Sequence, residues 1–450
     1  MTRLVVAPAD KPLRGSVPVP SDKSISHRAL ILAALGAGRS ELRRFSYGQD
    51  NLSTLAAFRA MGVEVEDDGR GALAVHGVGL AGLSAPSGDI DCGNSGTTMR
   101  LLSGVLAAQH FRTRLVGDVS LSRRPMGRVV HPLRARGAII EGRPHPTRPQ
   151  DPTAPLVIGP LPDGTRLGPL EYAMPIASAQ VKSALLLSGL FASGPTLLSE
   201  PLVSRDHTER MLLALDMPIE TAGPTLSLHP PADPDAIHPF GIDLPGDLSA
   251  AAFLLVAAAL VDDSQVTVRD TGLNPTRAGI VELLRVFGAN GGITPRGETL
   301  GEPWGEITAA GGALRGAPVG GEVAVRAIDE IPIACALAAR ARGTSTFSDV
   351  AELRVKESDR IALMVGLLRS FGVEAEERED GLVVEGQPEK RLRAAEVDSG
   401  GDHRVAMTAA VLGLVADGET VIDNVDCIAT SFPRFAGTLR ALGASVEVRP

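Results

Sequence analysis

The sequence predicts an α/β fold in two domains, each built from three copies of a βαβαββ unit. One pattern recurs six times along the chain: a β-branched strand, a polar loop, an amphipathic helix and a break that usually contains glycine. Six further helices lie between these copies and are apolar nearly all round, as buried helices are. A chain of 450 residues is also too long for one hydrophobic core. We therefore expect the apolar helices inside each domain and the sheets outside.

The six copies are identified by their strands and by the breaks that end their exposed helices. The strands are expected at 40–42, 113–116, 196–198, 265–268, 345–347 and 420–422. The breaks fall at 61–65, 136–138, 216–218, 287–289, 371–373 and 442–444. Glycine suits most of these breaks because it readily adopts the left-handed conformation in which many helices end.

The six apolar helices each follow a short strand-like segment, such as 87–91 or 241–244. Their expected starts are Ser24 and the segments 94–97, 178–180, 246–249, 329–330 and 401–404. Polar and small residues at these positions can cap a helix. The glycine-rich segment 312–321 is expected to be a loose loop.

The domain boundary is visible because 245–250 restarts the pattern of 20–24. We expect one domain at 21–245 and a second formed by 1–20 together with 246–450. Two connections, near 19–21 and 244–247, would join the domains and act as a hinge. Such an arrangement favours closure over a ligand bound in a cleft between the domains.

Composition excludes several classes of partner. A net charge of −9 argues against general attraction to nucleic acid or to an anionic membrane. An aromatic content of 3% argues against recognition by base stacking. The longest apolar run, near 249–261, is too short to span a bilayer, and the first residues do not resemble a signal peptide.

The cysteines and histidines do not indicate a metal site. Cys92, Cys335 and Cys427 lie far apart, which favours a reduced, cytoplasmic compartment, and Cys92 is expected to be buried and inert. The histidines lack the spacing of a ligand set, so no metal and no cofactor are predicted. His403 is more notable than the others because Asp402 and Arg404 flank it. We expect a monomer.

Basic and hydroxyl side chains collect at the helix starts, beginning with the stretch from Ser21 to Arg28. Free backbone N–H groups and the positive end of the helix dipole favour an anion at such a place. The set comprises Lys23, Ser24, Arg28, Arg100, Arg124, Ser178, Gln180, Lys182, Arg205, Lys356, Arg360 and Arg404. If the helix starts converge, these groups suit two anionic molecules. For the stretch from Ser21 to Arg28, the alternative is a capped surface helix with solvated charges.

Two acidic residues stand among these cations. Asp329 opens an apolar helix, and Glu357 lies between Lys356 and Arg360. A carboxylate beside cations can stay ionised or deliver a proton, as general acid–base catalysis requires. The alternatives are a helix cap for Asp329 and a surface salt bridge for Glu357.

These motifs resemble those of the enolpyruvyl transferase family, and most closely its 5-enolpyruvylshikimate-3-phosphate synthase branch. The resemblance covers essentially the whole chain and rests on 21–28, 94–100, 123–126, 178–183, 353–360 and 402–404. It implies an inside-out α/β barrel in each of two hinged domains. It also implies transfer of the enolpyruvyl group of phosphoenolpyruvate to the 5-hydroxyl of shikimate 3-phosphate, with release of phosphate.

The resemblance also implies which residues bind each substrate. Shikimate 3-phosphate would be held by Lys23, Ser24, Arg28, Ser178, Ala179, Gln180, Arg205, Asp329 and Lys356. Phosphoenolpyruvate would be held by Lys23, Gly96, Arg124, Gln180, Arg360 and Arg404. Asp329 is the expected base at the hydroxyl, with Lys23 as an alternative, and Glu357 would move the proton at C3.

The chain departs from many relatives at two places. Ala179 stands where many have serine, so only its backbone N–H can serve. Thr430 and Ser431 precede Phe432 where many have lysine, which puts one phosphoenolpyruvate contact in question. Two other functions remain open: the sister transferase that acts on UDP-N-acetylglucosamine, and a non-catalytic protein that closes on a phosphorylated metabolite. Retention of both Asp329 and Glu357 argues against the latter.

Overall fold

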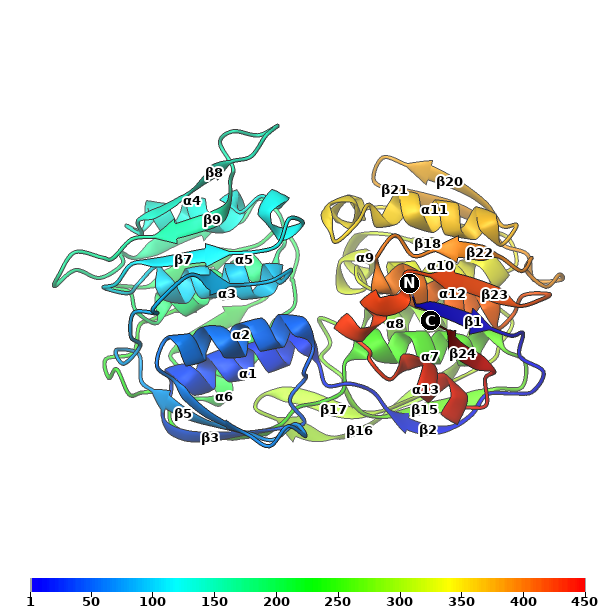
Figure 1. Cartoon of the computed structure of the whole chain (residues 1–450), viewed down its shortest axis with the longest axis horizontal. Helices are drawn as coiled ribbons and strands as arrows, with labels where there is room; N and C mark the ends of the chain where they lie inside the picture. Colours follow the sequence, from blue (N-terminus) through cyan, green and yellow to red (C-terminus); the bar gives the residue numbers. More distant parts are fainter. Residues whose placement is uncertain (1, 450) are drawn as a thin grey trace. The chain divides into compact units, whose positions relative to one another are not determined.

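The computed structural model describes residues 2–449, and within them the chain divides into two compact units. Unit 1 comprises residues 2–20, 245–297 and 303–449, and unit 2 comprises 21–244 and 298–302. The short segment 298–302 is the tip of a hairpin whose two strands otherwise belong to unit 1. Figure 1 shows the course of the chain through both units.

Six sheets of four strands each account for the named strands of the described chain, three in each unit. In unit 2 the sheets are β14(Gly241–Asp243)-β3(Ala37–Arg43)-β5(Leu73–Val78)-β4(Glu64–Asp67), β6(Ile90–Asp91)-β7(Thr113–Val116)-β9(Pro152–Ile158)-β8(Ile140–Pro144) and β10(Leu170–Ala173)-β11(Thr196–Ser199)-β13(Thr225–Leu228)-β12(Ile219–Ala222). In unit 1 they are β16(Asn290–Thr299)-β17(Glu302–Ala310)-β15(Gln265–Gly272)-β2(Arg14–Pro18), β18(Pro318–Val319)-β19(Thr344–Phe347)-β21(Gly381–Glu385)-β20(Glu374–Arg378) and β22(Glu396–Asp398)-β23(Thr420–Asp423)-β1(Arg3–Val6)-β24(Val446–Arg449).

Each sheet contains the same pairing. One outer strand runs parallel to its neighbour, as β6 does to β7, and the next strand is antiparallel, as β9 is to β7. The predicted repeat and its strands are therefore confirmed. The predicted loose loop at 312–321 is wrong in part, because Pro318–Val319 forms β18, which pairs with β19, and a helix begins at Gly321.

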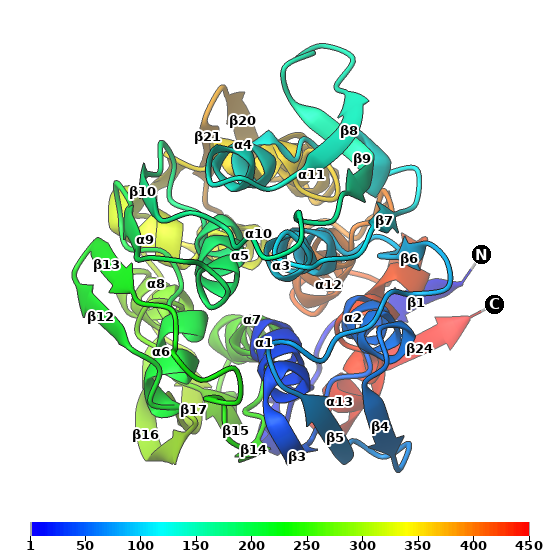
Figure 2. The same cartoon turned by 90° about the vertical axis from the view of Figure 1, so that its left-hand side faces the viewer.

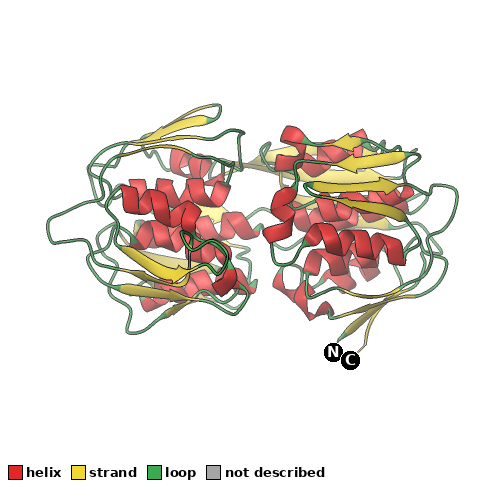
Figure 3. Cartoon of the chain, turned by 90° about the horizontal axis from the view of Figure 1, so that it is seen from above, coloured by secondary structure: helices red, strands yellow, loops and turns green. Residues whose placement is uncertain are grey.

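The apolar helices occupy the centre of each unit, as predicted. They are α1(Lys23–Leu35), α3(Gly96–Leu106) and α5(Ala179–Gly189) in unit 2, and α7(Leu248–Leu260), α10(Ile331–Arg340) and α12(His403–Gly413) in unit 1. In Figure 2, α1, α3 and α5 lie inside the strands of their unit, and Figure 3 distinguishes helices from strands by colour. All thirteen residues of α7 are buried, because its sequence offers no polar face to solvent.

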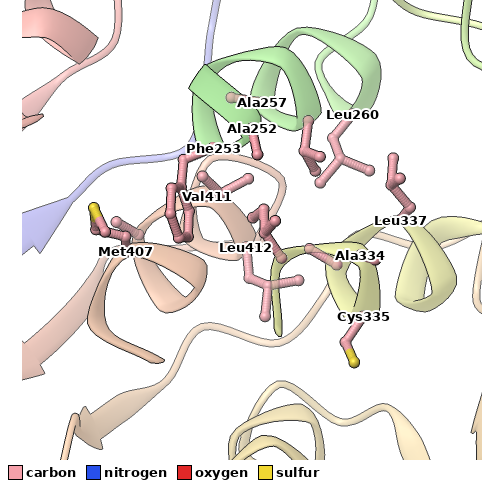
Figure 4. Close-up of a cluster of buried hydrophobic side chains, with 14 of the residues drawn as sticks. Ala252, Phe253, Ala257, Leu260, Ala334, Cys335, Leu337, Met407, Val411 and Leu412 are labelled. Atoms are coloured by element: carbon pink, nitrogen blue, oxygen red, sulfur yellow. The ribbon is translucent and has the colours of Figure 1, made fainter. Parts of the chain in front are cut away.

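Figure 4 shows how the three central helices of unit 1 pack. Phe253 and Leu260 of α7, Leu337 of α10 and Leu412 of α12 point into one shared cluster. Alanines such as Ala257 separate these larger side chains along α7, which lets the helices pack closely. The charged residues of these helices lie at their ends, whereas the buried Thr408 is a polar residue in the middle of α12.

The remaining helices lie nearer the surface. They are α2(Gln49–Ala60), α4(Gly127–Ala135), α6(His207–Ala214), α8(Gly279–Val286), α9(Gly321–Arg326), α11(Arg360–Ser370) and α13(Phe435–Ala441), with 3-10 turns η1(Leu121–Arg123), η2(Ala351–Val355) and η3(Val425–Thr430). Five of the six predicted breaks carry a glycine with positive φ, for example Gly62 at 90° and Gly137 at 104°. In the third copy Asp216 takes that conformation, with φ of 58°.

Two connections carry the chain between the units, in opposite directions. Strand β2 belongs to a sheet of unit 1 but leads into α1 of unit 2, whereas β14 belongs to a sheet of unit 2 and leads into α7 of unit 1. The N–H of Asp247 donates to the carbonyl of Pro20 at 2.7 Å, so the two passing segments meet. No helix of residues 2–449 is both long and apolar enough to cross a membrane.

Candidate active site

In unit 2 the start of α1 presents Lys23 and Ser24. Asp22 caps the helix, because its carboxylate accepts from the N–H of Ile25 at 2.9 Å. The Lys23 ammonium donates to Asp50 Oδ2 at 3.0 Å, and just over a quarter of the lysine side chain is exposed. The structure thus places a partly accessible cation and a hydroxyl residue at the positive end of a buried helix.

Arg28, one turn further along α1, is buried and held by neutral oxygen atoms. Its guanidinium donates to Thr208 Oγ1 at 2.8 Å, to Ser183 Oγ at 2.7 Å and to the Ser24 carbonyl at 2.9 Å. Burial lowers the pKa of Arg28 to about 10, although Glu209 opposes this shift. The arginine stays charged at neutral pH and its hydrogen-bond partners are neutral, although Glu209, Asp22 and Glu302 lie near enough to stabilise the charge.

The starts of α3 and α5 are joined through Gln180. Its Oε1 accepts from Arg100 Nη1 at 2.5 Å, and its Nε2 donates to Thr97 Oγ1 at 2.9 Å. Gly96 is the first residue of α3, and a Cβ built there would lie 2.8 Å from Arg100 Nη1 and 3.4 Å from Arg124 Nη1. The absence of a side chain at Gly96 therefore lets both guanidinium groups lie close to the helix start.

Arg124 follows η1 and reaches back to the turn before α3. It donates to Asn94 Oδ1 at 2.5 Å and to Ser120 Oγ at 3.3 Å, while its buried Nε has no hydrogen-bond partner among the described residues. Asn94 is itself held by Asp118, to which it donates at 2.6 Å. The guanidinium is thus oriented by neutral groups, as that of Arg28 is.

The remaining predicted residues of unit 2 lie at two other helix starts. Ser178 is the N-cap of α5, Ala179 is its first residue, and Arg205 lies half-buried just before α6. Lys182 differs from the expectation that it would be available to an anion. Lys182 is buried, and its ammonium lies 2.7 Å from a carboxylate oxygen of Glu200 and 2.7 Å from one of Glu209. These two carboxylates already neutralise its charge.

In unit 1 the corresponding polar cluster surrounds Arg360, which is buried. The guanidinium donates to Asp402 Oδ2 at 2.8 Å, lies 2.6 Å from Glu357 Oε2 and lies 3.6 Å from Asp329 Oδ1. Burial alone would lower the pKa of Arg360, but Glu357, Asp402 and Asp329 outweigh burial and raise it. Burial alone would likewise raise the pKa of Asp402, but Arg360 holds it below its usual value.

The two acids singled out in the sequence are both in this cluster. Asp329 lies just before α10, with its carboxylate 3.9 Å from the Lys356 ammonium and about a sixth of its side chain exposed. Glu357 is more accessible, with 34% of its side chain exposed. The cluster therefore combines two partly exposed carboxylates with the cations Lys356 and Arg360.

Arg404 and His403 open α12. Arg404 Nη1 donates to the backbone carbonyl of Asp329 at 2.6 Å, which connects the start of α12 to that of α10. His403 is buried, and burial lowers its pKa to about 4, with Arg404 acting in the same direction. At neutral pH His403 is therefore uncharged and does not add to the cationic set.

Three further residues considered in the sequence are placed as follows. Cys92 is buried, and burial raises the pKa of its thiol to about 12, in line with the expectation of an inert residue. Thr430 ends η3, and the hydroxyl of Ser431, directly after it, is buried without a hydrogen-bond partner among residues 2–449. Neither supplies the charge that a lysine would.

Sequence reasoning missed the neutral network behind α1 and α3. His27 Nδ1 lies 2.8 Å from Thr54 Oγ1, which in turn lies 2.8 Å from Thr98 Oγ1. Burial lowers the pKa of His27 to about 3. Sequence reasoning also missed the environment of Glu330, a fully buried acid beside Asp329. A charged residue inside an apolar helix start was a usable signal, but its partners Arg404 and Ser249 are 74 and 81 residues away.

The structure thus combines six central helices, whose starts carry cations and acids, with outer sheets that share one strand pairing. Together these features define a class of protein: a two-unit α/β enzyme for phosphorylated, anionic substrates. A protein-family model described as EPSP synthase (3-phosphoshikimate 1-carboxyvinyltransferase) matches residues 8–439. The chain belongs to the EPSP synthase family.

Individual relatives agree over almost their full length. The 3-phosphoshikimate 1-carboxyvinyltransferase of Acidithiobacillus ferrooxidans is 46% identical over 448 residues, which cover 100% of this chain and 99% of the relative. The protein of the same name from Geobacter sulfurreducens is 46% identical over 95% of this chain and 96% of its own. An EPSP synthase structure from Acinetobacter baumannii covers both chains fully, with a TM-score of 0.88 and 39% identity.

Proposed function

We propose that this protein carries out the reaction for which its family is named. It would transfer the enolpyruvyl group of phosphoenolpyruvate to the 5-hydroxyl of shikimate 3-phosphate and release phosphate, on the route to chorismate and the aromatic amino acids. The observation that carries the proposal is the cluster in unit 1, where Asp329 and Glu357 stand within 4 Å of Lys356 or Arg360. A site for binding alone has no use for acids beside its anion ligands.

Residues at the helix starts would form two overlapping sets, one for each substrate. Shikimate 3-phosphate would bind Lys23, Ser24, Arg28, Ser178, the Ala179 N–H, Gln180 and Arg205 of unit 2 and Asp329 and Lys356 of unit 1. Phosphoenolpyruvate would bind Lys23, Gly96, Arg124, Gln180, Arg360 and Arg404. The neutral partners of Arg28 and Arg124 support this assignment, since they orient the guanidinium groups without cancelling their charge.

The chemistry would proceed by addition and elimination. The 5-hydroxyl loses its proton and its oxygen bonds to C2 of phosphoenolpyruvate, while C3 gains a proton. The tetrahedral intermediate then loses phosphate from C2 and the proton from C3, which restores the double bond. Glu357 would carry the C3 proton in both directions, and Arg124, Arg360 and Arg404 would offset charge on the departing phosphate.

Asp329 is favoured over Lys23 as the base at the hydroxyl. The Lys23 ammonium is paired with Asp50 at 3.0 Å, and a nearby carboxylate stabilises the protonated form of an amine. Asp329 is a partly exposed carboxylate, and its neighbours Lys356 and Arg360 stabilise its ionised form. A base must be unprotonated when substrate arrives, and cations beside a carboxylate favour that form.

We also propose that the two groups of helix starts act together, with the connections near 19–21 and 244–247 as a hinge. The short length of these connections and the division of the proposed ligands between two compact units support this. Small-angle X-ray scattering would test it: the radius of gyration should fall when both substrates are added. An unchanged radius would contradict the hinge.

The reaction is tested by measuring phosphate released from phosphoenolpyruvate in chelator-treated buffer. Release should require shikimate 3-phosphate and should not occur with UDP-N-acetylglucosamine. Release only with the nucleotide sugar would assign the sister reaction, and binding without release would indicate a non-catalytic protein. The chelator also tests the expectation that no metal is needed.

Two properties proposed from the sequence are tested separately. A monomer is expected, and sedimentation of the purified chain would measure its mass against the 46.7 kDa of one copy. A cytoplasmic location is expected from the sparse, unpaired cysteines, and fractionation of the source cells would test it.

A further inference from the structure

Glu330 is a buried charge in unit 1 that the proposed mechanism does not use. Its side chain is fully buried at the N-cap of α10, and its Oε1 accepts a hydrogen bond from the Ser249 hydroxyl in the first turn of α7. Its Oε2 has no hydrogen-bond partner in the described part of the chain. A buried carboxylate lowers the free energy of unfolding unless a cation compensates its charge. We therefore expect a functional reason for the position of Glu330.

The nearest cation is Arg404, whose Nη1 lies 3.9 Å from Glu330 Oε1. The same nitrogen donates to the backbone carbonyl of Asp329 at 2.6 Å. The side-chain hydrogen bond and the ion pair of Arg404 within residues 2–449 both involve Nη1, so this end of the guanidinium is held against the start of α10. The other end can then meet an anion.

Glu330 also connects the starts of the three central helices. Ser249 belongs to α7, Glu330 caps α10 and Arg404 lies on α12. Arg277 supports this group by donating to Ser249 Oγ at 3.1 Å and to Asp247 at 2.6 Å. A shift of Glu330 would therefore move both Arg404 and the carbonyl of Asp329.

The second arginine of unit 1 shows what such a partner does. Arg360 is held by the buried Asp402 at 2.8 Å and approached by Glu357 and Asp329. Arg404 has no ion pair with any of those three among the described residues, and Glu330 is its carboxylate partner. Glu330 is thus the buried carboxylate beside Arg404 as Asp402 is beside Arg360, but at 3.9 Å instead of the 2.8 Å of the hydrogen-bonded pair.

We propose that Glu330 is a positioning residue, which orients Arg404 for the phosphoenolpyruvate anion. This role rests on the proposed function. Glu330 touches no substrate in the proposal, because it is fully buried, and it acts through Arg404.

The test is Glu330→Gln, which keeps the size of the side chain and the acceptor for Ser249 but removes the charge. The KM for phosphoenolpyruvate should rise on the order of tenfold, as expected for a displaced binding group, while the KM for shikimate 3-phosphate changes less than twofold. Glu322→Gln is the matched control, because Glu322 is an exposed acid paired with Arg326 on α9 of the same unit.

A double-mutant cycle identifies the residue through which Glu330 acts. In an Arg404→Ala background, Glu330→Gln should add no further rise in the KM for phosphoenolpyruvate. If Glu330→Gln does not fold, Ser249→Ala replaces it and should raise the same KM by a smaller factor. An unchanged KM in the folded variant, or full additivity with Arg404→Ala, would overturn the inference.

Failure of the inference and failure of the proposed function give different results. Turnover of the wild-type protein with shikimate 3-phosphate establishes the function whatever Glu330 does. If the wild type does not turn over, calorimetric titration with phosphoenolpyruvate still measures the anion site. Weaker binding by Glu330→Gln, on the order of tenfold, would support the positioning role, and equal binding would contradict it.

Discussion

Two buried arginines, Arg28 in unit 2 and Arg360 in unit 1, are stabilised in opposite ways. Arg28 donates to two hydroxyl groups and one carbonyl, and burial lowers its pKa to about 10. Arg360 lies among three carboxylates, which raise its pKa despite complete burial. Neutral partners leave the positive charge of Arg28 available to an anion, whereas the charge of Arg360 is shared with acids that can also move protons.

The same contrast extends to the neighbouring residues. Arg124 and Arg100 of unit 2 are oriented by the amides Asn94 and Gln180. In unit 1, Lys356 and Arg404 have carboxylate neighbours. Lys23 and Lys182 are exceptions in unit 2, because Asp50 pairs with Lys23 and two glutamates neutralise Lys182. We infer that unit 2 mainly binds and orients, and that unit 1 supplies the acid–base groups.

The largest effect on stability is expected for Asp402→Asn. The substitution keeps the shape of the side chain but leaves the buried guanidinium of Arg360 without its fully buried carboxylate partner, at a cost of about 3–5 kcal/mol. Urea unfolding would measure it. The wild-type pair should itself weaken in acid: because the pKa of Asp402 is lowered in the folded state, its contribution is present above the ordinary value of 3.8 and is lost as the pH falls below it. A loss under 1 kcal/mol would mean that Glu357 and Asp329 suffice for Arg360.

The largest effect on rate is expected for Glu357→Gln. An amide cannot deliver or take up the C3 proton, so kcat should fall on the order of 10²–10³ with little change in either KM. Glu374→Gln, an exposed residue at the start of β20, is the control and should leave kcat unchanged. If Glu357→Gln kept kcat within a few-fold of wild type, the proton-transfer role would be wrong.

Acid should destabilise both units through their buried histidines. The pKa of His27 is lowered to about 3 and that of His403 to about 4, against 6.5 when unfolded. Each neutral histidine makes its full contribution to the free energy of unfolding above pH 6.5. As the pH falls toward the folded-state pKa values, this contribution decreases by about 1.4 kcal/mol per pH unit for each histidine. His27→Gln should make the pH dependence less steep between pH 6 and 4. An equally steep dependence in this variant would assign the acid sensitivity to other groups.

A smaller loss is expected for Ser183→Ala, which removes a neutral partner of Arg28. The hydroxyl accepts from Arg28 at 2.7 Å and from Thr208 at 2.7 Å, and losing it should cost about 1–3 kcal/mol of unfolding free energy. Comparison with Asp402→Asn under the same urea conditions tests the contrast between the units directly. Equal losses would show that charge does not distinguish the two arginines.

The fold was largely predictable because its signals are local. An all-apolar segment such as α7 specifies a buried helix, and five of the six breaks contain a glycine at positive φ. The predicted starts of the central helices differ from the observed ones by only one or two residues, as at α1, which begins at Lys23 instead of Ser24. Periodicity carries this information without any knowledge of contacts.

The partners of the site residues were not predictable, because they are distant in the sequence. Lys182 was grouped with the anion ligands, yet Glu200 and Glu209 neutralise it. Glu330 was noted only as a neighbour of Asp329, and its contact with Arg404 spans 74 residues of sequence. Residue types at helix starts indicate what kind of molecule binds, but only the tertiary packing decides which cations keep their charge available.

The smallest effect is expected for Gly96→Ala, which tests the geometry of unit 2 without changing any charge. The new Cβ would lie 2.8 Å from Arg100 Nη1 and 3.4 Å from Arg124 Nη1, so the ends of both guanidinium groups must move by a few tenths of an ångström. Because both are flexible side chains, the protein should remain folded, and the KM for phosphoenolpyruvate should rise by about three- to tenfold. Gly88→Ala is the control, since a Cβ at Gly88 meets nothing within 4 Å. An unchanged KM would show that unit 2 tolerates movement of its cations, and the idea that neutral partners orient them for phosphoenolpyruvate would then be wrong.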